Sequence, residues 1–118
     1  MTAMAAEGLL NKVYGETTQT PLDEVTADGA SDVIDLGQLV NHYTMQLVVT
    51  GSPTDGTVTL EGPLNGTDFS ALLTTPVSGG NTFDSDFGTL IRYLRTSLAG
   101  LAGGTDPTVT AHVAAIRS

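Results

Sequence analysis

Near the middle of the chain stands the run Leu60-Glu61-Gly62-Pro63-Leu64-Asn65-Gly66-Thr67-Asp68-Phe69. Val58 and Leu60 alternate with polar residues before the turn, and Phe69 follows it, so these apolar side chains are spaced to cover one face of a sheet. Asn65 and Gly66 supply the positive φ angles that a tight turn needs. The run therefore predicts a strand, a turn and an aromatic side chain that returns toward a core.

The clearest strand pattern lies just upstream of this run. Apolar side chains recur at every second position there, at Tyr43, Met45, Leu47 and Val49. The connection over residues 51–56 is short and full of turn-forming residues. We therefore expect residues 43–50 and 57–62 to form an antiparallel hairpin.

Further strands are predicted on both sides. Residues 33–36 form a short one that breaks at Gly37, and residues 69–74 form a third member beside the hairpin. Residues 75–89 show weak periodicity and hold one short strand or only loop, with Phe83 and Phe87 as core anchors. Residues 89–98 and 108–116 are strand-like, and a glycine-rich loop from residue 99 to residue 107 joins them.

Six or seven short strands without alternating helices predict an all-β fold. We expect an antiparallel β-sandwich or a jelly-roll-like barrel over residues 31–118, preceded by an extended N-terminal arm over residues 1–30. Residues 2–14 could start a short helix, although a helix of this length is marginal alone. Residues 15–31 are polar and predict extended arm or loop. We expect Leu9, Leu10, Tyr14 and Leu22 to contact a partner, with packing on the parent domain as the alternative.

The composition excludes several classes of function. The 118 residues carry 13 acidic and four basic side chains, a net charge of -9, and no cysteine. Nucleic-acid binding is therefore not expected, because phosphate contacts need clustered Lys and Arg. No stretch approaches the roughly 20 apolar residues of a membrane helix, and no export signal is recognised, so we expect a soluble protein. An acidic surface suits a basic protein partner, although solubility is its commoner use.

Candidate chemical sites are few. His42 and His112 lie in strand patterns with no adjacent nucleophile motif, so we expect polar surface or edge roles and no enzymatic activity. Asp68, Asp84 and Asp86 could supply oxygen ligands, but they lack the spacing of a calcium loop. No metal and no cofactor is expected.

Two arginines are candidates for an interface. Alternation places Arg92 on one face of its strand and Arg95, with Tyr93, on the other. They either neutralise carboxylates such as Glu61 or Asp68 within the sandwich, or they contact an acidic partner.

The run over residues 60–69 resembles the LEGSLDG..W signature of small β-sandwich virion proteins of tailed phages. Here Pro63 stands in place of Ser, Asn65 in place of Asp and Phe69 in place of Trp. The resemblance extends from about residue 31 to residue 118, through residues 92–95 and 107–111.

This resemblance implies a structural virion protein, a phage capsid decoration or minor capsid protein on the outside of an icosahedral shell. Its implied partners are the major capsid protein and further copies of itself, as a trimer or a dimer, with neither nucleic acid nor membrane. Its implied location is the capsid surface after synthesis in the host cytoplasm. The N-terminal arm would spread over neighbouring subunits.

Two other functions stay open. The same turn signature occurs in sandwich domains that recognise sugars, so a carbohydrate-binding or host-attachment module on the virion surface is one alternative. Exposed aromatic platforms are the usual mark of such modules, and we expect most of the three Tyr and three Phe to be needed in the core. A tail-tube or head-tail connector subunit is the other alternative.

Overall fold

The computed structural model describes residues 17–117. Its strands are β1 (Thr17–Val25), β2 (Gly29–Ala30), β3 (Ile34–Thr50), β4 (Asp55–Gly62), β5 (Ser70–Pro76), β6 (Thr82–Ala102) and β7 (Thr108–Ile116). A short 3-10 helix, η2 (Val77–Gly79), separates β5 from β6. No helix in this part of the chain is long and apolar enough to cross a membrane.

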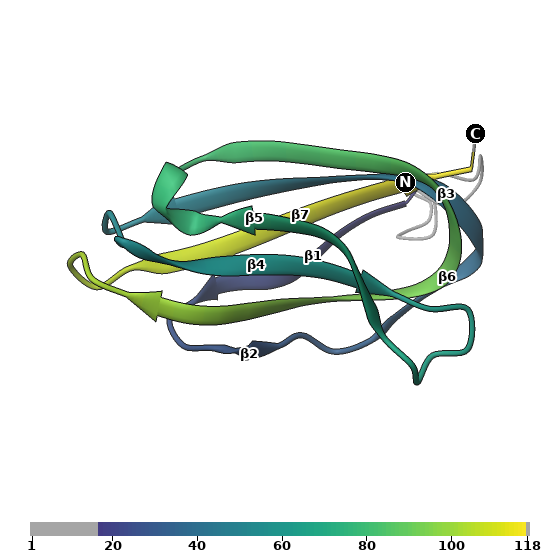
Figure 1. The fold of residues 1–118 in the computed structure, drawn as a ribbon, viewed down its shortest axis with the longest axis horizontal. Coiled ribbons are helices and arrows are strands. Elements are labelled where there is room, and N and C mark those ends of the chain that lie inside the picture. The colour runs from purple at the N-terminus through teal and green to yellow at the C-terminus, as the bar shows by residue number, and fades with distance from the viewer. Residues whose placement is uncertain (1–16, 118) are drawn as a thin grey trace, which may run out of the picture.

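All strand pairs are antiparallel, and they form two sheets that share β6. The first sheet has the order β1-β7-β3-β6, and the second the order β2-β6-β4-β5. β6 pairs with β3 up to Leu94 and with β4 from Arg95 onward. In Figure 1 this strand runs along the top, bends at the right-hand end and returns along the lower side. The arrangement is an antiparallel β-sandwich, as the sequence predicted.

Alternation along the strands builds the core between the sheets. Tyr43, Met45 and Leu47 of β3 are fully buried, as are Val58 and Leu60 of β4. Each contributes stability at about 25 cal/mol per Å² of apolar area removed from water.

The bend in β6 is held from the opposite loop. The Pro63 carbonyl accepts hydrogen bonds from the N–H groups of both Arg92 and Tyr93, at 3.1 and 3.3 Å. Gly88 has a φ of 113°, a backbone conformation that residues other than glycine rarely adopt. The sequence therefore allows one strand to turn from the first sheet into the second.

The expected hairpin between residues 43–50 and 57–62 was wrong, although both segments are strands. β3 lies between β7 and β6, whereas β4 lies between β5 and β6. The chain leaves β3 through Gly51 (φ 81°) and Ser52 (φ 52°) and enters the other sheet. Turn-forming residues signal a change of direction, but they do not say which sheet the next strand joins.

The expected break at Gly37 was also wrong. β3 continues through it, and its register with β6 shifts between Asp35 and Val40. Gly37 has a φ of 75°, so the backbone bends there within one long strand.

The segment expected to be arm or loop contributes two strands instead. β1 pairs with β7, with Thr17 opposite Ala115 and Val25 opposite Val109. β2 pairs with β6 near Leu98. The prediction failed because β1 needs few apolar side chains of its own when its backbone pairs with a strand at the far end of the sequence. Residues 17–30 thus belong to the sandwich.

The remaining strand predictions fared better. β5 lies beside β4, and β7 spans residues 108–116, as expected. β6 is longer than expected: it takes in the uncertain segment after residue 82 and continues to Ala102, into the segment expected to be a loop. The helix predicted within residues 2–14 lies outside the described residues.

Candidate functional site: an aromatic sheet edge

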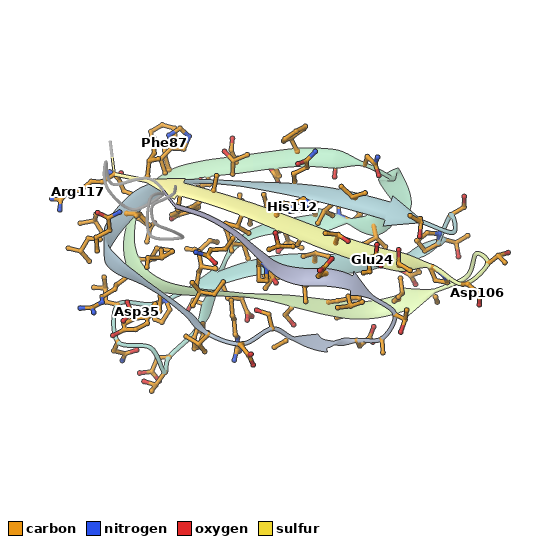
Figure 2. The ribbon with its side chains drawn as sticks, turned by 180° about the vertical axis from the view of Figure 1, so that it is seen from behind. Glu24, Asp35, Phe87, Asp106, His112 and Arg117 are labelled. Atoms are coloured by element: carbon orange, nitrogen blue, oxygen red, sulfur yellow. The ribbon has the colours of Figure 1, made fainter. Side chains whose placement is uncertain are left out.

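Two phenylalanines project from the outer face of the first sheet. Phe83 and Phe87 are each 72% exposed, and Figure 2 shows Phe87 standing clear of the ribbon at the edge. Their direction follows from register, because Phe83 lies opposite Gln46 and Phe87 opposite His42 on β3. The expectation that they anchor the core was wrong. Alternation identifies the two faces of a strand, but it does not say which face is buried.

On the face that carries the two phenylalanines, the neighbouring positions of β6 and β3 hold no Asp, Glu, Lys or Arg. Ser85 lies between them, with Thr44 opposite it on β3. The His42 ring lies 5.9 Å from the Phe87 ring, tilted by 60°, a separation and tilt common in aromatic pairs. A shallow depression continues across the sheet over His42, Thr44, Ala114 and Ile116. We call residues 82–87 of β6 the aromatic edge.

Two carboxylates alternate with the phenylalanines and lie on the opposite face of the strand. Asp84 Oδ2 accepts a hydrogen bond from Thr75 Oγ1 of β5 at 3.0 Å, and its Oδ1 accepts one from the Ser85 N–H at 2.9 Å. Asp86 lies opposite Tyr43 on β3. Burial raises the pKa of the Tyr43 hydroxyl and the charge of Asp86 raises it further, against the opposing effect of the hydrogen bond to Thr89 O.

Along its outer side the aromatic edge forms no strand ladder within residues 17–117, although the side chain of Thr75 on β5 reaches Asp84. β3 pairs with it on one side, and the next partners of β6, β4 and β2, begin only at Arg95. On an unpaired strand, main-chain groups that no side chain occupies can hydrogen-bond with another chain.

Arg92 and Arg95, the two candidate interface cations, form ion pairs within the chain. Arg95 Nε donates to Glu61 Oε1 at 2.7 Å, and its guanidinium lies 4.1 Å from the centre of the Phe69 ring. Arg92 donates from Nε and Nη2 to both carboxylate oxygens of Asp35, at 3.0 and 3.2 Å, which raises the pKa of Arg92. This geometry agrees with neutralisation of carboxylates. Any contact with a partner stays a prediction.

The Asn65-Gly66 turn supports the same region of β6. Gly66 has a φ of 79°, whereas Asn65 does not adopt a positive φ. Asn65 acts through its side chain instead, because its Oδ1 accepts the N–H groups of Thr67 and Asp68 at 3.0 and 3.1 Å. A Cβ at position 66 would lie 3.6 Å from the Tyr93 ring, so the turn packs against β6 at the bend.

The other predicted site residues do not gather. Leu22 is only 4% exposed and packs in the core, and Leu9, Leu10 and Tyr14 lie outside the described residues. His112 Nδ1 and Thr20 Oγ1 are 2.9 Å apart. Within the described part of the chain, no three His, Asp or Glu side chains are grouped so that they could hold a metal ion.

No protein-family model matches the sequence, and no curated protein matches it. Solved structures do match. The SPBc2 prophage-derived protein YomS superposes with a TM-score of 0.57 at 16% identity, over 86% of this chain and 92% of that one. The CBM32 of AlyQ, in complex with 4,5-unsaturated mannuronic acid, gives 0.53 at 16% identity, over 86% and 95%.

A larger enzyme contains a similar domain. The family 89 glycoside hydrolase from Clostridium perfringens gives a TM-score of 0.56 at 9% identity, over 88% of this chain and 14% of that one. At such low identities these likenesses show a shared β-sandwich fold.

Sequence reasoning missed the aromatic edge, although a signal was present. Residues 83–87 read Phe-Asp-Ser-Asp-Phe, which is itself an alternating pattern. The two aromatic positions were assigned to the core because apolar residues usually face inward. Their true direction is set by pairing with β3, about 40 residues away in the sequence.

Proposed function

We propose that this protein is a structural component of a phage particle, a capsid decoration subunit that binds the outside of the shell and stabilises it. The aromatic edge carries this proposal. Two phenylalanines, each 72% exposed, lie on a strand that is unpaired along one side. A partner that covers the exposed rings on this unpaired strand would account for their position in water.

Residues 17–117 contain no assembled catalytic or metal-binding group of side chains, and this supports a structural role. The Thr20–His112 contact is the closest approach to a catalytic pair, but nucleophilic catalysis needs a third group that orients the imidazole. We therefore propose a protein without enzymatic activity. The likeness to a prophage-derived protein over most of both chains is consistent with a phage origin.

In the proposed mechanism, many weak contacts act together. Each subunit offers its aromatic edge to the major capsid protein, and Leu9, Leu10 and Tyr14 of the N-terminal segment reach a neighbouring subunit. Because sites repeat over a shell, one contact holds the next at high effective concentration. Self-association as a trimer or a dimer adds further contacts.

Rate-zonal sedimentation of the native source, followed by mass spectrometry, tests the proposal. We expect this 12.1 kDa chain to travel with large particles, at near-stoichiometric ratio to their most abundant protein. A few copies per particle would favour the tail-tube or connector role. Absence from every particle would contradict a virion function.

Add-back to particles that lack the protein tests the surface. The double variant Phe83→Ser/Phe87→Ser is expected to bind at least tenfold more weakly than the unaltered chain. Leu64→Ser is the matched control, because Leu64 is 59% exposed but lies in the loop between β4 and β5. Equal losses from both variants would mean that exposed apolar area, rather than the aromatic edge, drives attachment.

Carbohydrate binding is the second candidate, and one observation favours it. Phe83 and Phe87 lie on one face, about 13 Å apart at the strand repeat, beside Gln46 and Thr44, which can hydrogen-bond to hydroxyls. Phe83 and Phe87 are not used in the core, contrary to what we expected for most of the aromatic residues. Titration with neutral oligosaccharides, monitored by backbone amide shifts, tests this role. Saturable shifts at residues 82–87 would support it.

A further inference from the structure

The sandwich has several free strand edges, and they differ in how they are protected. β1 contains Pro21, a positive φ at Glu24 and two shifts of register, and β5 ends in Pro76. β2 is only two residues long. These are ways in which natural sheets discourage added strands. The aromatic edge has none of them: its pairing with β3 runs without a shift from Thr82 to Phe87, and it contains no proline.

Its protection is electrostatic instead. Asp84 and Asp86 place two carboxylates on this edge, in alternation with the phenylalanines. Asp84 also accepts the N–H of Ser85, so a main-chain donor of the edge is occupied by a side chain of its own strand. The carbonyl of an approaching strand can replace Asp84 Oδ1 as the acceptor of the Ser85 N–H, but a neutral or acidic strand offers the displaced carboxylate oxygen no cation in return.

A second copy of the chain fits this edge poorly. Phe83-Asp84-Ser85-Asp86-Phe87 reads the same in both directions. A two-fold axis at Ser85 would therefore pair each phenylalanine with a phenylalanine, but it would also place Asp84 opposite Asp86 of the other copy, twice. Like charges directly opposite each other destabilise a strand pair.

We propose that the aromatic edge accepts, as an added strand, an extended segment of a partner protein in which Lys or Arg alternates with apolar residues. This inference rests on the proposed structural function and specifies the partner's docking segment. Cations on the added strand lie opposite Asp84 and Asp86, and apolar side chains lie beside Phe83 and Phe87. Engagement of Asp84 by a cation releases the Ser85 N–H for the new ladder.

Charge complementarity assigns the cations to the partner. Among residues 17–117 the only Lys or Arg side chains are Arg92, Arg95 and Arg117, and the first two already pair with Asp35 and Glu61. Main-chain hydrogen bonds supply affinity in strand addition, and the flanking side chains supply selectivity. The alternating carboxylates thus reject neutral or acidic strands and admit basic ones.

Synthetic peptides test this with the full chain. The first probe is the heptapeptide Thr-Phe-Lys-Ser-Lys-Phe-Thr with blocked ends, and the second has Glu in place of both Lys. Two further probes keep the Lys residues but carry N-methyl groups on one or the other set of alternate amides. Binding is followed by the backbone amide shifts of the protein.

We expect the Lys peptide to shift the amides of residues 82–87 and to bind at least tenfold more tightly than the Glu peptide. One N-methylated peptide should lose at least tenfold in affinity and the other should not, because only one set of amides faces β6. Asp84→Asn/Asp86→Asn should remove the preference for Lys. Equal binding of all Lys peptides would mean that an acidic protein attracts basic peptides in general, and it would overturn the proposal. Amide shifts at residues other than 82–87 would overturn it as well.

The outcomes separate this inference from the proposed function. If the chain travels with particles but the Lys peptide does not select the edge, the docking segment is wrong and the structural function stands. If the peptide results hold but the chain is absent from every particle, the edge recognises basic strands in another setting. A dimer of the unaltered chain that pairs through residues 82–87 would overturn the inference.

Discussion

The two halves of β6 belong to one continuous strand but lie in different surroundings. From Leu94 onward the strand lies among paired neighbours, and Leu94, Thr96 and Leu98 are buried. Before the bend it has β3 on one side only, and Phe83 and Phe87 face solvent. Apolar and polar side chains alternate in both halves, so the sequence pattern alone does not distinguish the exposed half from the buried one. The second half contributes buried side chains to the core, whereas the first half exposes its aromatic side chains to solvent.

The largest expected difference is in stability. Leu98→Ala removes a side chain that is 1% exposed and should lower the free energy of unfolding by about 2–5 kcal/mol. Phe87→Ala should change it by less than about 1 kcal/mol, because the ring is mostly in water. Urea denaturation followed by circular dichroism measures both. A larger loss from Phe87→Ala would mean that the first half also carries the fold.

Self-association provides the next test. Asp84→Asn/Asp86→Asn removes the like charges that oppose pairing of two copies, so we expect at least tenfold tighter dimerisation by sedimentation equilibrium. Asp23→Asn/Asp106→Asn makes the same change in net charge at exposed sites away from this edge. This control should dimerise no more tightly than the unaltered chain. Dimerisation of both variants would point to net charge rather than to the edge.

The ion pairs near the bend should contribute less. Arg95→Met removes a partly buried pair and the contact with Phe69, and it should cost about 1 kcal/mol of unfolding free energy. Arg92→Met should cost less than Arg95→Met, because the Arg92 and Asp35 side chains are 45% and 48% exposed and solvent screens their attraction. Chemical denaturation at low and high salt compares them. Equal costs would show that exposure does not distinguish the two pairs.

The smallest effect is expected at the far end of β6. The Asp28 carboxylate accepts the N–H groups of Leu101 and Gly100, which lowers the pKa of Asp28. Since the folded pKa lies below the unfolded value of 3.8, this stabilisation is present above that pH and is lost as pH falls through the lowered pKa. Asp28→Asn should thus be less stable than the unaltered chain at neutral pH, with a difference that shrinks in acid. A difference in unfolding free energy that grows in acid would contradict a lowered pKa of Asp28 in the folded chain.

Much of the fold could be predicted because apolar residues alternate strongly in residues 43–50, 57–62 and 108–116. Strand pairing could not. The expected hairpin between β3 and β4 used only the local turn, whereas β3 pairs with strands about 40 and 70 residues later. β1 was missed for a related reason, because a strand defined by main-chain pairing with β7 needs little apolar sequence of its own.

The candidate site was the least predictable part. Phe83 and Phe87 carry the right periodicity for a strand, but their exposure depends on the register with His42 and Gln46. The ion pair of Arg95 with Glu61 was anticipated as one possibility, because residues 92–95 hold two of the four cations in a chain with 13 acidic residues. The pairing of Arg92 with Asp35 was not, because it requires knowing that β3 and β6 are neighbours.

The continuity of β6 has a mechanical consequence. A pull on the aromatic edge along the strand direction is passed through covalent bonds around the bend into the second sheet, where β4 and β2 flank the strand. The hydrogen bonds of both ladders then resist sliding as a group, instead of opening one after another from a free end. The Pro63 carbonyl, bound to Arg92 and Tyr93 at the bend, keeps that corner from straightening. A force applied at this edge is therefore distributed through both halves of the sandwich.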